Sequence, residues 1–251
     1  MSAFADLHRR GAPLVLPNAW DHASAAALFG AGFPAVGTTS LGVAAVHGLP
    51  DATGAARAET IALTKLIARL PGMVTVDIES GFSSNPAEVA DLAVRLSDAG
   101  AVGVNLEDAM TDPQALCGLI EAIKRAVPGL FVNARTDTYW LGDSSLDETL
   151  VRAESYVDAG ADGIFVPGMA EPDEIAAVVD QVDAPLNLLF LPGKHTVTEL
   201  AALGVSRIST GSLLFRAAVH ATVATALAVR DEQPVPPGIP GYDETVKMLG
   251  L

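Results

Sequence analysis

The chain repeats one local pattern, in which an apolar helical stretch ends at a glycine and a short run rich in Val, Ile or Phe follows. The clearest copies read FGAGFPAVGTTS, SDAGAVGVNLED, VDAGADGIFVPG and AALGVSRISTGS. Glycine is the usual residue just after a helix, and apolar runs without polar alternation are typical of strands that helices cover on both faces. The pattern therefore predicts alternating helices and strands in a parallel sheet.

Eight such units account for most of the 251 residues. The expected strands are Leu14–Leu16, Ala35–Gly37, Met73–Val76, Val102–Leu106, Leu130–Asn133, Gly163–Val166, Leu186–Phe190 and Arg207–Ser209. The expected helices are Asp21–Phe29, Ala56–Leu70, Ala87–Ala99, Pro113–Ala126, Leu146–Ala159, Glu171–Gln181, Val197–Leu203 and Leu213–Val229. This number and order predict an α/β fold of the (β/α)8 TIM barrel type. A doubly wound sheet is the alternative, but it would place a glycine-rich phosphate loop after the first strand, where this chain has LPNAWD.

The C-terminal part divides the chain into two regions. We assign 1–232 to the barrel, as the catalytic domain, and 233–251 to a proline-rich arm with a short terminal segment. The sequence PVPPGIP at 234–240 cannot be helical and predicts an extended arm that reaches a neighbouring subunit, so we expect a homo-oligomer, either dimer or tetramer. The apolar stretch Leu213–Val229 contains Arg216 and His220, which are costly in hydrocarbon, and predicts a buried or packing helix.

Composition narrows the class of partner. The chain has 15 basic and 30 acidic residues, a net charge of −15, which disfavours nucleic acid and acidic membrane surfaces. A single cysteine, Cys117, excludes an intrachain disulfide and a zinc site built mainly from thiolates. No export signal is evident at the N-terminus, and we expect a cytoplasmic protein.

Polar and acidic residues follow four consecutive expected strands. They are Thr38, Thr39 and Ser40, then Asp77 and Glu79, then Glu107 and Asp108, then Arg135 and Asp137. In a TIM barrel these strand ends converge on the active site, where several carboxylates need a cation or protons to offset their repulsion. Oxygen ligands favour Mg²⁺, with Mn²⁺ as the alternative, and no histidine lies beside them in sequence.

Structural roles remain open for each of these residues taken singly. Asp77 would also suit a helix cap, and Glu107 with Asp108 would suit a solvated turn. Arg135 either neutralises the acids or grips a substrate carboxylate or phosphate with two parallel hydrogen bonds. His47 is a proton-transfer residue or an exposed loop residue. Cys117 lies at helical spacing and is expected to fill the core.

As a set, these motifs resemble the isocitrate lyase and phosphoenolpyruvate mutase superfamily, which includes phosphonomutase and methylisocitrate lyase-like proteins. The resemblance rests on TTSLGVA followed by GLPD, and on VDIESGF, NLED and NARTD. It implies a Mg²⁺-dependent enzyme that acts on, or forms, small 2-oxo acids or dicarboxylates through an enolate-like intermediate. It also implies that subunits exchange their final barrel helix.

The resemblance assigns a role to each matching residue. Asp77 would bind Mg²⁺ directly, and Glu79 and Glu107 would hold its waters. The Thr39 hydroxyl and the backbone N–H groups of Ser40 and Leu41 would bind the oxo-acid carboxylate. Arg135 would grip a second anionic group, and Asp51 would act catalytically from a moving loop.

The chain departs from this family in two loops. The family's lyases carry a Lys-Arg-Cys-Gly-His type loop, and its mutases carry a Lys and an Asn there, where this chain reads EDAMTDPQALCGL. Many members end the sixth strand with Pro-Glu, where this chain has Pro167 and Gly168. Retro-aldol cleavage is the leading hypothesis. Carbon–phosphorus rearrangement, hydrolysis of an oxaloacetate-like diacid and non-catalytic binding of an oxo acid are the alternatives.

Overall fold

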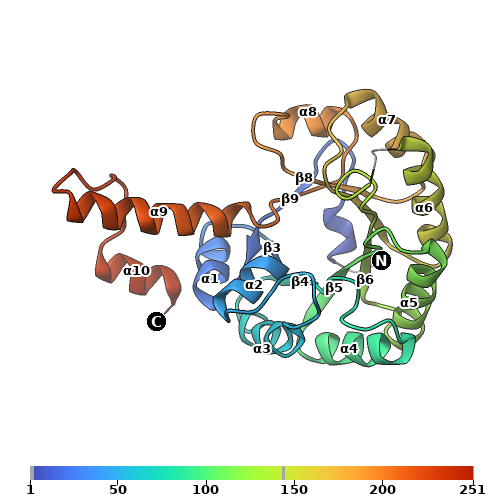
Figure 1. Ribbon diagram of the computed structural model, residues 1–251, viewed down its shortest axis with the longest axis horizontal. Helices are drawn as coiled ribbons and strands as arrows, with labels where there is room; N and C mark the ends of the chain where they lie inside the picture. Colours follow the sequence, from blue (N-terminus) through green and yellow to red (C-terminus); the bar gives the residue numbers. More distant parts are fainter. Residues whose placement is uncertain (1–2, 143–144, 251) are drawn as a thin grey trace.

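The computed structural model describes residues 3–142 and 145–250 and shows parallel strands wrapped by helices (Figure 1). Within these residues, nine strands form one sheet in the order β1-β9-β8-β7-β6-β5-β4-β3-β2. β1 (Leu14–Leu16) pairs with β9 (Arg207–Ser209), and β2 (Asn18–Ala19) pairs with β3 (Ala35–Thr38). Only Pro17, which has no N–H to donate, separates β1 from β2, so the two form one interrupted strand that closes the barrel. The TIM-like α/β barrel is confirmed.

The remaining strands match their predicted positions within two residues. They are β4 (Met73–Asp77), β5 (Ala101–Glu107), β6 (Phe131–Arg135), β7 (Gly163–Val166) and β8 (Leu186–Leu189). Around them lie α1 (His22–Gly30), α3 (Arg57–Ile67), α4 (Pro86–Asp98), α5 (Pro113–Ala126), α6 (Leu146–Asp158), α7 (Pro172–Gln181) and α8 (Val197–Ala202). Side-chain caps start several of these helices: Asp21 accepts from the Ser24 N–H, and Thr196 accepts from the Glu199 N–H.

Two short helices in the first 50 residues were not predicted. The 3-10 helix η1 (Ala5–Leu7) lies at the N-terminal end of the strands, where His8 stacks on Phe131 at 4.5 Å between ring centroids. Helix α2 (Ser40–Val46) begins directly after β3, so the residues expected in a binding loop form its first turn. This places the backbone N–H groups of Ser40 and Leu41 at a helix N-terminus, where such groups lack intrahelical partners.

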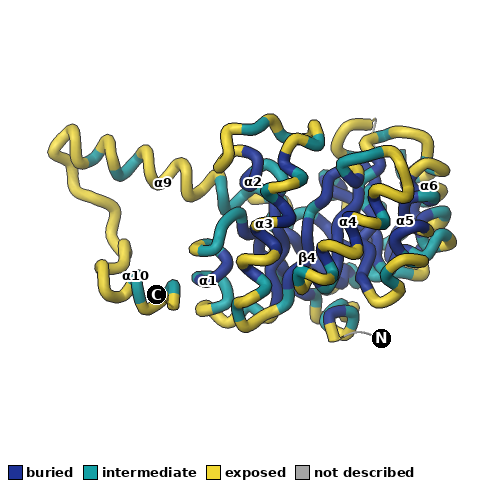
Figure 2. The backbone as a smooth tube through the Cα atoms, turned by 90° about the horizontal axis from the view of Figure 1, so that it is seen from below, coloured by how far each residue is buried: buried dark blue, intermediate teal, exposed yellow. Residues whose placement is uncertain are grey.

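The predicted helix over Leu213–Val229 is not buried within the described chain, and its packing against a partner stays a prediction. α9 (Leu213–Arg230) projects away from the barrel, and none of its residues is buried (Figures 1 and 2). Val219, Val223 and Leu227 follow one another at intervals of four residues and are 42% to 53% exposed, because the described part of the chain does not cover them. The exchange of this helix between subunits is not shown.

The arm after α9 turns back toward its own barrel. The last helix, α10 (Tyr242–Leu249), contacts α1, so the C-terminal region leaves the barrel along one path and returns along another (Figure 1). Leu251, the end of the predicted terminal segment, lies outside the described residues. By length and composition alone, α9 is able to cross a membrane, with a mean hydropathy of 1.3. It shares this property with apolar helices that pack against protein.

Candidate active site

The carboxylate of Asp77, at the end of β4, meets the first turn of α2. The Ser40 N–H donates to Asp77 Oδ2 at 3.1 Å, and the Asp77 N–H donates to Thr38 Oγ1 at 2.8 Å. Thr39 is buried and starts α2 without a side-chain cap, and Leu41 is half-buried in the first turn. The predicted metal ligand and the predicted carboxylate-binding segment therefore lie side by side.

Glu79 follows Asp77 in a strained turn. Its φ of 50° is in the left-handed region, which is uncommon for residues other than glycine. Glu79 Oε2 accepts from the Gly54 N–H at 2.9 Å, which brings the segment that carries Asp51 over the site. Among the described residues, Glu79 Oε1 and Asp51 Oδ1 are buried without a hydrogen-bond partner. Burial, together with the Asp77 and Asp51 charges, raises the pKa of Glu79.

Arg135, the last residue of β6, joins two acids. Its Nη1 lies 2.8 Å from Glu107 Oε2, and its Nε lies 2.6 Å from Asp137 Oδ1. The guanidinium carbon is 5.8 Å from the centre of the Phe165 ring. Burial raises the pKa of Glu107 to about 8, with the Asp77 and Asp137 charges adding to the effect and Arg135 opposing it. We name Asp77, Glu79, Glu107 and Arg135 the rim cluster.

The rim cluster suits a cation held partly through water. Among the described residues, no three His, Cys, Asp or Glu side chains come together as a complete metal site. Mg²⁺ commonly binds through one or two carboxylates and keeps several waters, so a complete protein cage is not required. The buried, unpartnered oxygens of Glu79 and Asp51 are acceptors that a hydrated cation would satisfy. Asp77 would hold Mg²⁺, with Glu79 and Glu107 on its waters.

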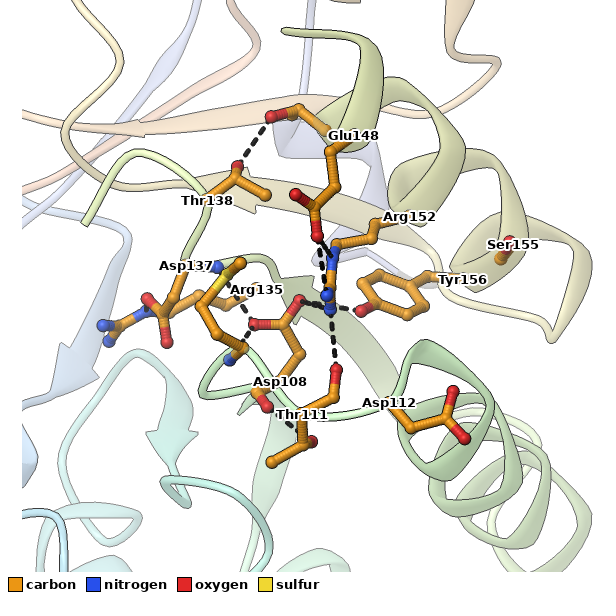
Figure 3. Close-up of polar contacts among 12 residues, drawn as sticks. Asp108, Thr111, Asp112, Arg135, Asp137, Thr138, Glu148, Arg152, Ser155 and Tyr156 are labelled. Carbon is orange, nitrogen blue, oxygen red and sulfur yellow. Dashed lines mark hydrogen bonds and ion pairs between the residues drawn. The ribbon is translucent and has the colours of Figure 1, made fainter. Parts of the chain in front are cut away.

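Asp108 does not join the rim acids, which corrects the sequence prediction. Neighbouring residues at a strand end point to opposite sides of the sheet, so Glu107 faces the barrel interior and Asp108 faces helix α6. Asp108 Oδ2 accepts from Arg152 Nη1 at 3.0 Å and from the Tyr156 hydroxyl at 2.8 Å (Figure 3). We name Asp108, Arg152 and Tyr156 the Asp108 cluster. Neither Arg152 nor Tyr156 was predicted, although the spacing Glu148, Arg152, Tyr156 is a visible signal of a polar helix face.

Two other expectations concern residues away from the rim. Cys117 lies in α5, is 6% exposed and donates weakly to the Ser155 carbonyl at 3.5 Å, so its predicted role in the core is confirmed. His47 is exposed just after α2.

The barrel and its rim define a class of protein, a TIM-like α/β barrel with an acidic site at the carboxyl ends of its strands. Residues 4–230 match the protein family described as phosphoenolpyruvate phosphomutase. The chain belongs to this family, within the phosphoenolpyruvate mutase and isocitrate lyase superfamily of lyases, mutases and hydrolases.

Relatives extend this result along the chain. An uncharacterized protein of Mycobacterium tuberculosis strain H37Rv is 45% identical over 243 residues, which cover 95% of this chain and 93% of that relative. A 2-methylisocitrate lyase of Halalkalibacterium halodurans is 31% identical over 193 residues, which cover 70% of this chain and 63% of that relative.

Solved structures agree with the fold. A phosphonomutase-like protein from Burkholderia cenocepacia J2315 has a TM-score of 0.84 and 37% identity, over 88% of this chain and 96% of that chain. A phosphonopyruvate hydrolase in complex with oxalate and Mg²⁺ has a TM-score of 0.85 and 25% identity, over 99% of this chain and 94% of that chain.

Proposed function

We propose that the protein is a Mg²⁺-dependent enzyme that breaks or makes a carbon–carbon bond of a small 2-oxo acid or 2-hydroxy diacid. The observation that carries this proposal is the rim cluster itself, in which Arg135 pairs with Glu107 while Glu79, beside Asp51, keeps a buried oxygen without a partner among the described residues. Burial beside neighbouring acids raises the pKa values of Glu79 and Glu107, and a bound cation would offset the repulsion among these carboxylates. The relative solved with oxalate and Mg²⁺ supports the same ligand chemistry.

Each residue would then have a distinct task. Bound Mg²⁺ would supply a positive charge that stabilises the negative charge developing on the substrate's oxo oxygen. Thr39, Ser40 and Leu41 would hold the oxo-acid carboxylate at the start of α2. The carboxylate partners of Arg135 engage Nε and Nη1, so Nη2 is the nitrogen left for a second substrate anion. Asp51 would act from the 47–56 segment, whose closure over Glu79 limits access of water.

The loop after β5 bears on which reaction occurs. Residues 109–112 read Ala-Met-Thr-Asp and offer no lysine, cysteine or histidine for proton transfer, which is the feature that favours the second candidate, a non-catalytic oxo-acid binding protein. Cleavage is the first proposal, because a 2-methylisocitrate lyase is 31% identical over 70% of this chain. Rearrangement of a carbon–phosphorus bond and hydrolysis of an oxaloacetate-like diacid are the other reactions of this class.

Two measurements test the function. Calorimetry with oxalate should show binding that requires Mg²⁺ or Mn²⁺, and a panel of 2-hydroxy and 2-oxo diacids should reveal turnover of at least one member. Binding without turnover on any substrate would favour the binding protein. Absence of metal-dependent oxalate binding would contradict both candidates.

We also propose that α9 and the arm at 234–240 join subunits into a dimer or tetramer with exchanged helices. The support is the exposed apolar face of α9, because large apolar patches of soluble chains usually mark interaction sites. Light scattering at micromolar concentration should return a multiple of 25.8 kDa. Val223→Asp with Leu227→Asp should shift the protein toward monomer, whereas a monomeric wild-type protein would remove the proposal.

A further inference from the structure

The Asp108 cluster has no role in the function proposed above, yet it is among the most completely bonded groups in the barrel. Asp108 is 1% exposed, and its carboxylate accepts four hydrogen bonds. Oδ2 accepts from Arg152 and Tyr156, whereas Oδ1 accepts from the backbone N–H groups of Met110 at 3.0 Å and Asp137 at 3.1 Å. One buried side chain therefore ties the loop after β5, the loop after β6 and helix α6 together.

The bond to the Asp137 N–H connects this cluster to the rim. Asp137 receives that bond on its backbone, while its own Oδ1 accepts from Arg135 Nε at 2.6 Å. Asp137 is buried, and its carbonyl accepts from the Trp140 and Leu141 N–H groups, so its backbone is held from both sides. The position of Arg135 thus depends on Asp137, and the position of Asp137 depends on Asp108 (Figure 3).

Arg152 and Tyr156 in turn hold Asp108 in place. Arg152 donates from Nη1 to Asp108 Oδ2 and to the Thr111 carbonyl at 2.9 Å, and its Nε donates to Glu148 at 2.8 Å. The loop they secure contains Ala109 and Met110, both with positive φ, at 44° and 58°. Two consecutive non-glycine residues in this region cost energy, so the loop keeps this shape only because its surroundings impose it.

We propose that Asp108, Arg152 and Tyr156 are positioning residues that fix Arg135 for its grip on the substrate's second anion. The proposal rests on the proposed function for the meaning of that grip, but the positioning itself is a property of the free protein. A buried carboxylate with two donors on each oxygen, one of them a charged guanidinium, holds its neighbours rigidly, because any displacement leaves a charge unpaired.

The test compares Arg135 in two variants and one control. Asp108→Asn replaces one carboxylate oxygen with an NH2 group, which donates and cannot accept, and Tyr156→Phe removes one donor with little change in shape. Lys124→Met is the control, because it breaks a 2.7 Å ion pair with Asp162 in the same helical layer but at the opposite end of the strands. The readout is the NMR signal of the Arg135 Nε–H, assigned by its disappearance in Arg135→Lys.

Without any ligand, exchange of the Arg135 Nε–H with water should accelerate about tenfold in Asp108→Asn and about threefold in Tyr156→Phe. It should not change in Lys124→Met, even if that variant melts earlier. With Mg²⁺ present, oxalate affinity should fall by a similar factor in the two cluster variants. If Asp108→Asn does not fold, Tyr156→Phe alone decides the outcome.

Two results distinguish a failure of this inference from a failure of the proposed function. Unchanged Nε–H exchange in both cluster variants, together with a lowered melting temperature, would mean that the cluster only stabilises the fold and would overturn the inference. If the wild-type protein does not bind oxalate with Mg²⁺, the proposed function fails, and the exchange rates still decide whether the cluster positions Arg135.

Discussion

The rim cluster and the Asp108 cluster both hold buried acids beside an arginine, but they satisfy those acids differently. Glu79 at the rim keeps a buried oxygen without a partner among the described residues, whereas both oxygens of Asp108 are bonded twice. Glu107 and Asp108 are consecutive, so a single peptide unit separates a rim acid paired with Arg135 from an acid that four donors enclose. The difference indicates that carboxylates with unpartnered oxygens mark the binding site, whereas fully hydrogen-bonded carboxylates hold the surrounding loops in position.

Replacement of Asp77 should have the largest effect on function and a small effect on folding. Asp77→Ala removes the residue proposed to bind Mg²⁺ directly, and turnover should fall on the order of a thousandfold or more, with loss of metal dependence. Cys117→Ser is the control and should leave turnover largely intact, because Cys117 is buried in α5. A large loss of activity in folded Cys117→Ser would instead assign the cysteine to catalysis.

Replacement of Arg152 should, in contrast, have a large effect on folding stability. Arg152→Met leaves the Asp108 charge buried with fewer donors, and the free energy of unfolding measured in urea should fall by about 3–5 kcal/mol. Arg57→Met is the matched control, since Arg57 lies 3.9 Å from an exposed Asp91, and it should change that free energy by less than about 1 kcal/mol. Equal losses in the two variants would erase the distinction between a buried cluster and a surface ion pair.

The sequence predicts the barrel well because its evidence is local and repeated. Each strand is an apolar run after a helix-ending glycine, and all eight were found within two residues of their predicted positions. The convergence of Asp77, Glu79, Glu107 and Arg135 followed from one rule, that carboxyl ends of barrel strands meet at one face. The fold and the placement of these residues at the carboxyl ends of the strands were therefore predictable from the sequence, whereas their roles stay predictions.

What the sequence could not predict depended on side-chain direction and on surfaces outside the chain. Asp108 was assigned to the rim because it directly follows Glu107, yet pleating turns it toward α6. Tyr156 lies 48 residues from Asp108, so their bond has no local signal. The apolar pattern of α9 predicts a packed helix but not what covers it, and this chain does not cover it.

A milder substitution in the rim cluster tests whether Arg135 binds the substrate or only neutralises the acids. Arg135→Lys keeps the positive charge but loses the planar fork that bonds two acids and an anion together. Oxalate affinity in the presence of Mg²⁺ should fall by about ten- to a hundredfold, or about 1.5–3 kcal/mol, while the melting temperature barely changes. Normal oxalate binding with a much lower melting temperature would mean that Arg135 mainly neutralises the rim acids, as Arg152 helps to do for Asp108.

The smallest expected effect is on the pH dependence of the free energy of unfolding. It distinguishes Glu107 in the rim cluster from the fully bonded Asp108. Burial raises the pKa of Glu107 in the folded protein from 4.5 to about 8, so the folded state binds its proton more tightly than the unfolded state does. Stability from this proton is complete below the unfolded pKa and is lost as the pH rises toward the folded pKa. Without metal, the free energy of unfolding should therefore fall as the pH rises from 5 to 8. Glu107→Gln should remove most of this dependence on pH.

Saturating Mg²⁺ should also reduce the dependence of the free energy of unfolding on pH, since the cation favours the ionised acids. If metal-free stability rises over this range, Glu107 is ionised in the folded protein, and the contrast with Asp108 lies in geometry rather than in charge.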